Sequence, residues 1–134
     1  VIMMLDIDRF KFVNDHYGHS FGDKVLNQVA AKISESTRKS DIAGRYGGDE
    51  FLIVLPSATI ESAKAVAGRI LNSVSQLAIG DVPAQISVSI GIAGRTHEKE
   101  VHEVIEKADF AMYRAKRDGG NSLRLFEDTL ISEN

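Results

Sequence analysis

The chain has 134 residues, with 43% hydrophobic and 26% charged residues, no cysteine and a formal net charge of -3. This length suits one domain with a proper core, the lack of cysteine excludes disulfides and thiolate metal sites, and the slight negative charge argues against a general nucleic-acid binder. No stretch is typical of a signal peptide or a membrane-spanning helix, so we expect one cytosolic domain over residues 1–134 with no membrane contact of its own.

The first predicted element is a strand. Residues 1–5 form a continuous apolar run, typical of a strand buried on both faces, and lead into Asp6-Ile7-Asp8. Side chains alternate along a strand, so Asp6 and Asp8 should project to the same side. The sequence favours Asp8 mainly as the cap of the next helix, whereas Asp6 would need a metal or a donor beside it if buried.

Two helices and a hairpin follow. Residues 10–17 predict a short helix that stops at Gly18, and Gly22-Asp23 should open a second helix with apolar residues at helical spacing. Residues 42–46 and 51–55 predict the strands of a hairpin. Its turn contains Gly47-Gly48, which allow the positive backbone torsions of a tight hairpin turn and bring the main chain close to a ligand.

The second half alternates helices and strands. Thr59 should begin a helix after Pro56 ends the hairpin, and residues 86–92 alternate in the manner of a half-exposed strand. Residues 101–117 predict the last helix, which ends before a strand near residues 122–126. The order predicts an α+β fold with an antiparallel-rich sheet covered by helices.

Adjacent acids stand at the hairpin tip. Asp49-Glu50 follows the two glycines, and Arg45 stands just before them. Carboxylates beside a cation and a close-approaching backbone can hold a divalent metal and a phosphorylated substrate together. The alternative is a solvated turn, in which acids and glycines are also common.

Three blocks of the sequence resemble the GGDEF family of diguanylate cyclases. They stand in that family's order and spacing, and the resemblance spans nearly the whole chain. The blocks are residues 6–15 (DIDRFKFVND) with Gly18-His19 and Gly22-Asp23, residues 47–51 (GGDEF), and residues 107–116 (KADFAMYRAK).

The resemblance implies a palm-like, ferredoxin-like fold similar to that of nucleotidyl cyclases. It also implies a reaction in which two GTP molecules condense into cyclic di-GMP, each by attack of a ribose 3′-hydroxyl on the α-phosphate of the other, with release of pyrophosphate. Two Mg²⁺ ions per active site, or Mn²⁺ in their place, are expected, as is a homodimer whose sites face each other. Family members usually carry an extra helix ahead of the first strand, and this sequence begins at that strand.

Matching positions give the expected metal ligands and base. The resemblance implies that Asp6, the Ile7 carbonyl and Asp49 bind metal, with Glu50 as a further ligand. Hard oxygen ligands suit Mg²⁺. Asp49 is the first candidate for the base, and Glu50 stays open as the alternative because adjacent strand residues point oppositely.

Other matching positions imply the GTP site. Asn14 and Asp23 correspond to residues that read guanine, a base whose ring N–H and amino group suit a carboxylate acceptor. His19 is a possible nucleotide neighbour, and Gly47 with Gly48 would admit the phosphates. Without the resemblance, Asp23 as a helix cap and Asn14 as a turn former remain open.

One lysine near the end of the last helix has two readings. Lys116 matches a phosphate-contacting position, but a solvated lysine that complements the helix dipole is an equal alternative. Where the family usually has Arg or Lys before Asn121, this chain has Gly120, which removes one expected phosphate cation.

A second group of residues is regulatory by resemblance. Arg38 and Asp41 match an Arg-x-x-Asp site at which cyclic di-GMP inhibits its own synthesis, and Arg69 matches a second arginine of such sites. Arginine binds phosphate and stacks on guanine, and an acid can pair with the guanine edge. Taken singly, these are ordinary surface charges.

Two other functions stay open. One is a non-catalytic module that senses cyclic di-GMP or GTP, and the other is a different nucleotidyl cyclase on the same fold. Formation of pyrophosphate and cyclic di-GMP from GTP would distinguish the enzyme from the sensor.

Overall fold

A computed structural model describes residues 1–82 and 84–127. One mixed sheet forms its centre, with the strand order β2-β3-β1-β4-β5, in which all neighbours are antiparallel except β4 and β5. The elements in chain order are β1 (Ile2–Ile7), α1 (Phe10–Tyr17), α2 (His19–Ser36), β2 (Ile42–Arg45), β3 (Glu50–Val54), α3 (Ile60–Ser75), β4 (Val88–Ala93), α4 (Val101–Arg117) and β5 (Ser122–Leu125).

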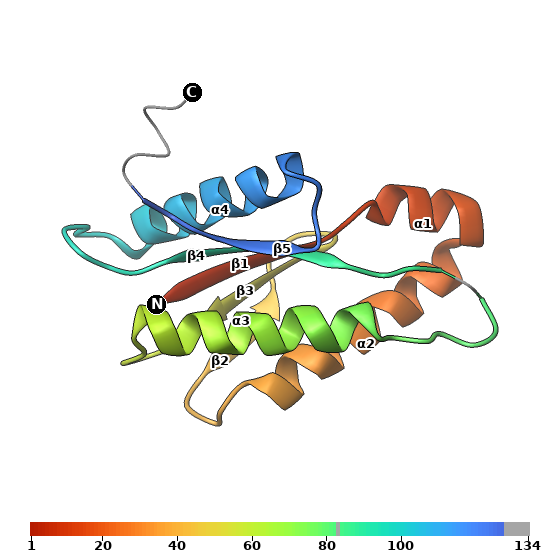
Figure 1. Ribbon diagram of the computed structural model, residues 1–134, viewed down its shortest axis with the longest axis horizontal. Helices are drawn as coiled ribbons and strands as arrows, with labels where there is room; N and C mark the ends of the chain where they lie inside the picture. Colours follow the sequence, from red (N-terminus) through yellow and green to blue (C-terminus); the bar gives the residue numbers. More distant parts are fainter. Residues whose placement is uncertain (83, 128–134) are drawn as a thin grey trace.

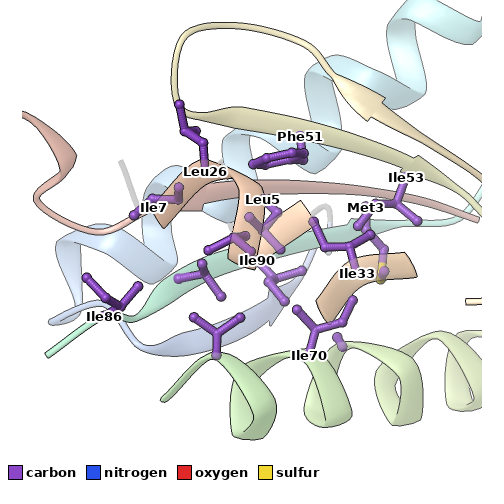
Figure 2. Close-up of a cluster of buried hydrophobic side chains, with 14 of the residues drawn as sticks. Met3, Leu5, Ile7, Leu26, Ile33, Phe51, Ile53, Ile70, Ile86 and Ile90 are labelled. Atoms are coloured by element: carbon purple, nitrogen blue, oxygen red, sulfur yellow. The ribbon is translucent and has the colours of Figure 1, made fainter. Parts of the chain in front are cut away.

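Helices cover both faces of the sheet (Figure 1). On one face, α2 and α3 pack against Leu5, Phe51 and Ile90 to form the larger apolar core, part of which is drawn in Figure 2. On the other face, α4 packs against Ile2 and Met4 in a smaller core. The α+β fold expected from the sequence is confirmed. No helix in the described part of the chain is both long and apolar enough to cross a bilayer.

The close packing of α4 on β4 depends on a glycine. A Cβ atom added to Gly91 would lie 2.0 Å from the carbonyl oxygen of Ala108 and 2.2 Å from the amide nitrogen of Met112. No side chain fits in that space, so the helix backbone can lie directly on the strand. This contact holds the C-terminal turns of α4 near the end of β1.

Local signals placed several elements correctly. The observed bounds of α1 and α4 agree with the predicted ranges, and Thr59 caps α3 through a reciprocal pair of hydrogen bonds with Ser62. Gly18 ends α1, as predicted.

Three local predictions were wrong. Every residue of β4 is buried, so β4 is not half-exposed, because α4 covers the face that carries its small residues. The helix α2 begins at His19 with Gly18 as its N-cap, three residues earlier than expected. Neither Gly47 nor Gly48 has a positive φ, and the loop from Tyr46 to Asp49 joins the strands without one.

The predicted capping role of Asp8 was also wrong. The N-cap of α1 is Arg9, in the left-handed region at φ 53°, and no side chain of the described residues caps this helix. The Asp8 carboxylate instead accepts hydrogen bonds from Ser87, Ser89 and the Asn121 amide.

Candidate active site

The acidic end of β1 lies against the tip of the β2–β3 hairpin. Asp6 pairs across the sheet with Glu50, and the Ile7 amide donates to the Asp49 carbonyl oxygen at 3.2 Å. Directly opposed residues of antiparallel strands project to the same face. The structure therefore brings together the acids that the sequence argument selected from two distant segments.

Asp6 is a buried acid with one cationic partner. Its carboxylate lies 3.2 Å from the Lys116 ammonium of α4, so this lysine faces the acids instead of projecting into solvent. The other oxygen, Oδ1, is buried and has no hydrogen-bond partner among the described residues. The Asp49 carboxylate also interacts with the Asp6 side chain, and two carboxylates can share a hydrogen bond only if one of them carries a proton.

Burial changes the acidity of Asp6. Loss of hydration and then the neighbouring Asp49 carboxylate raise the pKa of Asp6 to about 7, against the opposing attraction of Lys116. In the absence of a cation, this acid is therefore partly protonated near neutrality. A cation beside Oδ1 could replace that proton.

Asp109 of α4 is a neighbouring acid that the sequence argument did not select. Burial first, and then the charges of Asp109 and Asp49, raise the pKa of Glu50, and burial raises the pKa of Asp109 itself. Asp109 stands two helical turns before Lys116 and therefore shares its side of the helix, which was a readable signal. Several acids thus surround one lysine, and such a site favours cations.

A pocket of about 490 Å³ lies between α1, the first two turns of α2 and the hairpin tip. This volume is in the range of small-molecule sites. Three residues expected to contact the nucleotide, Asn14, His19 and Asp23, line it together with Gly48 and Asp49. The full lining is Phe10, Lys11, Asn14, Asp15, His19, Asp23, Leu26, Arg45, Gly48 and Asp49.

Gly22 places the Asn14 side chain. A Cβ atom at residue 22 would lie 1.8 Å from Asn14 Oδ1, so any other residue would displace the amide. Asp23 lies within α2, and the alternative in which it caps this helix was wrong because Gly18 holds that position. Asn14 and Asp23 thus remain on the pocket wall as polar groups for a ligand.

Two basic residues reach the same pocket. Lys11, which the sequence argument did not select, stands one helical turn before Asn14 on α1, a spacing that puts both on one helix face. Arg45 donates a hydrogen bond to the Gly48 carbonyl oxygen and so braces the hairpin tip. The pocket therefore combines groups suited to a base edge with cations suited to phosphate.

A family model described as "Diguanylate cyclase, GGDEF domain" matches residues 1–122. The chain belongs to the GGDEF family of diguanylate cyclases.

Individual relatives agree with this membership. Diguanylate cyclase DgcM of Escherichia coli (strain K12) is 40% identical over 120 residues, which are 90% of this chain and 29% of DgcM. Diguanylate cyclase A of Treponema denticola is 40% identical over 132 residues, which are 96% of this chain and 36% of that protein. The chain thus spans roughly a third of the length of these curated relatives.

A solved structure has the same fold. The GGDEF domain of DgcB from Caulobacter crescentus, determined in complex with c-di-GMP, has a TM-score of 0.88 and 35% identity, and the match covers 95% of this chain and 77% of that one. The nucleotidyl cyclase-like architecture is therefore that of GGDEF domains.

In this GGDEF domain the Arg-x-x-Asp residues form a tight turn before β2. Asp41 accepts a hydrogen bond from the Arg38 amide at 2.7 Å, and its side chain is 1% exposed. Arg38 and Arg69 line one pocket of about 210 Å³, and Arg38 also lines a second pocket of about 480 Å³ beside β2. The structure thus brings the two arginines together, while Asp41 supports the turn and one of its oxygens is buried and unpaired among the described residues.

The residues at the end of β1 suit a divalent cation whose remaining ligands are water and phosphate oxygens. Among residues 1–82 and 84–127, no group of three or more His, Asp or Glu side chains could hold a metal ion by itself. Mg²⁺ typically binds one or two carboxylates and keeps water and phosphate oxygens as further ligands. The unpaired Oδ1 of Asp6, the adjacent Asp49 carboxylate and the main chain at Ile7 are hard oxygen donors of that kind.

Proposed function

We propose that this GGDEF domain condenses two molecules of GTP into cyclic di-GMP with release of pyrophosphate. One observation carries the proposal: Asp49 belongs both to the acidic cluster with Asp6 and to the pocket with Asn14 and Asp23. The residues that would recognise guanine and the acids that would bind the metal ions of the phosphates are therefore neighbours, with Asp49 in both groups. That arrangement suits a nucleotide whose base enters the pocket and whose phosphates reach the acids.

Asn14 and Asp23 would select guanine. The Asp23 carboxylate can accept hydrogen bonds from the ring N–H and amino group of guanine, and the Asn14 amide adds a contact to the same edge. Adenine lacks this pair of donors, so it would leave the acid unsatisfied. His19 lines the same pocket and would lie beside the nucleotide.

Asp6, the Ile7 carbonyl and Asp49 would hold Mg²⁺ or Mn²⁺, two ions per active site, with Glu50 as a further ligand. Such ions neutralise charge on the phosphates and lower the pKa of a bound hydroxyl. Lys116 can turn from Asp6 to a phosphate, because its ammonium already lies 3.2 Å from the acid that would share the metal.

Asp49 is our candidate for the group that accepts the 3′-hydroxyl proton. Asp49 lines the nucleotide pocket, whereas Glu50 is not part of its lining. Contact with the substrate is the first requirement for a general base. Gly47 and Gly48 would leave the hairpin backbone open to the phosphates, since a Cβ atom at Gly48 would have no neighbour within 4 Å.

A second protomer would complete the reaction. One pocket of this size holds one nucleotide, and each GTP must be attacked by the hydroxyl of the other. We therefore propose a homodimer in which two such pockets face each other. Cyclic di-GMP would also bind at Arg38 and Arg69, and Asp41 would have to leave its turn before it could contact guanine.

A non-catalytic sensor of cyclic di-GMP or GTP is the second candidate. Gly120 favours it, because this position lacks the cation found in the family, and its φ of +75° disfavours any side chain there. Without that cation the domain would bind the triphosphate more weakly, which is compatible with a module that binds nucleotide and does not turn it over.

Incubation of the chain with GTP and Mg²⁺ tests the proposal, with pyrophosphate and cyclic di-GMP as the readouts. Asp49→Ala should lose at least 100-fold in turnover, in the range of a lost catalytic base. It should remain folded, because it removes the charge that repels Asp6. Glu61→Ala, an exposed acid on α3, is the matched control. Binding of cyclic di-GMP with no product from the wild-type chain would favour the sensor instead.

A further inference from the structure

The turn between α4 and β5 wraps around a carboxylate from the opposite end of the sequence. Three successive residues, Gly119, Gly120 and Asn121, have φ values of 114°, 75° and 47°. The left-handed region is uncommon for residues with a side chain, although asparagine adopts it more readily than most, and a hydrogen bond can hold Asn121 there. The backbone amide of Asn121 donates that hydrogen bond to Asp8 Oδ2, at 2.8 Å.

Asp8 is held by two segments at once, the start of β4 and the turn after α4. Ser87 Oγ donates to Oδ2 at 2.7 Å and Ser89 Oγ donates to Oδ1 at 2.6 Å, in addition to the Asn121 amide. The Asp8 amide also donates to the Ser87 carbonyl oxygen at 2.9 Å. Both oxygens of this carboxylate already accept hydrogen bonds from the protein. Asp8 is therefore a poor metal ligand, although it lies only two residues after Asp6.

Gly120 packs directly on this carboxylate. A Cβ atom at residue 120 would lie 2.9 Å from both Cγ and Oδ2 of Asp8, and the φ of +75° adds backbone strain. A side chain at this position would therefore have to displace the Asp8 carboxylate. The Asp8 carboxylate occupies the space in which a side chain at residue 120 would begin, and Gly120 leaves that space to it.

Two backbone hydrogen bonds also fix this turn to the end of α4. The Gly119 amide donates to the Lys116 carbonyl oxygen at 3.2 Å, and the Gly120 amide donates to the Ala115 carbonyl oxygen at 3.0 Å. A residue that holds this turn therefore also holds the helical turn that carries Lys116.

We propose that Asp8 is a positioning residue that fixes the exit of β1 relative to the last turn of α4. It keeps the Ile7 carbonyl and the Asp6 carboxylate in register with Lys116, so that metal and phosphate groups meet in one place. This inference rests on the proposed function, because it concerns the same metal and phosphate site. Residues that orient metal ligands typically change metal affinity 10–100-fold when they are lost.

Asp8→Asn tests the proposal in the full 134-residue chain. An amide retains one acceptor oxygen and directs N–H groups at donors, so at least one of the three hydrogen bonds is lost. We expect about tenfold weaker Mn²⁺ binding, measured by titration without nucleotide, and a rise in KM for GTP larger than the fall in kcat. Glu61→Gln, on the surface of α3, is the matched acid-to-amide control. Ser89→Ala keeps the carboxylate, removes one donor and should give a smaller change of the same kind, which keeps the test open if Asp8→Asn folds poorly.

A double-mutant comparison tests the contact itself. Gly120→Ala should weaken Mn²⁺ binding in the wild-type background and have a smaller effect in an Asp8→Ala background, where the collision is absent. Additive effects would overturn the proposal, as would Mn²⁺ affinity and KM within twofold of wild type in both Asp8→Asn and Ser89→Ala. A wild-type chain that binds neither Mn²⁺ nor GTP would overturn the proposed function and this inference with it. Normal wild-type binding with unaffected variants would overturn this inference alone.

Discussion

Replacing Asp6 with asparagine should make the metal-free domain more stable above neutral pH. In the folded chain, burial and the Asp49 carboxylate raise the pKa of Asp6 from 3.8 to about 7. Between these pH values the folded state holds a proton that the unfolded state has released. The stabilisation from this proton is fully present below about pH 4 and is lost as the pH rises through about 7.

The size of the effect follows from the shift. A raise of about three pKa units corresponds to about 4 kcal/mol, at about 1.4 kcal/mol per unit. The attraction of Lys116 for the carboxylate is already contained in that shift. Water entry and side-chain relaxation reduce the cost of a buried charge, so we expect Asp6→Asn to gain about 2 kcal/mol in unfolding free energy at pH 8.

Urea denaturation without divalent metal at pH 5 and pH 8 measures this gain. The advantage of Asp6→Asn over wild type should be larger at pH 8 by at least about 1 kcal/mol. Glu61→Gln should show no such pH dependence, because Glu61 is exposed. Added Mg²⁺ should stabilise the wild-type chain and not the variant. An Asp6→Asn chain that is no more stable than wild type at pH 8 would refute the reasoning.

Three further substitutions have outcomes that the structure determines. Gly91→Ala should cost about 3 kcal/mol or more in urea unfolding, because its Cβ would meet the α4 backbone, whereas Gly44→Ala, with open space around it, should stay within about 0.5 kcal/mol of wild type; equal effects would contradict this packing. Gly22→Ala should raise KM for GTP about tenfold by displacing Asn14, although alanine normally stabilises a helix; an unchanged KM would remove Asn14 from the nucleotide site. Arg38→Ala should raise the inhibition constant of cyclic di-GMP and spare catalysis, so unchanged inhibition would show that the 210 Å³ pocket is not the inhibitory site.

Local patterns were sufficient for most helices. The sequence predicted α1 and α4 with their observed bounds, from a stop at Gly18 and from apolar residues at helical spacing in α4, and Thr59 marked the start of α3. These signals lie within one or two turns of chain, so the sequence contains them directly. The start of α2 was predicted too late because Gly22 and Asp23, which read as a helix opening, lie inside the helix.

Burial and side-chain partners depend on segments far apart in the chain. Alternation predicted one exposed face for β4, but α4 covers that face, and alternation in a strand does not reveal what lies above it. Asp8 has the local signature of a helix cap, yet its carboxylate accepts hydrogen bonds from Ser87, just before β4, from Ser89 in β4 and from a turn more than a hundred residues away. Lys11 and Asp109 each share a helix face with a selected residue, a spacing that the sequence contains, but only packing shows that this face meets the pocket or the acids.

The sequence by itself determined which chemical groups the domain has and the family to which it belongs, because residue types and their spacing are properties of the chain. The tertiary structure decided which groups meet. Pairing of β1 with β3 opposes Asp6 to Glu50, and packing of α4 brings Lys116 to the same point. Such meetings depend on strand register and helix placement, which arise from many weak contacts summed over the whole core and are not present in any single segment.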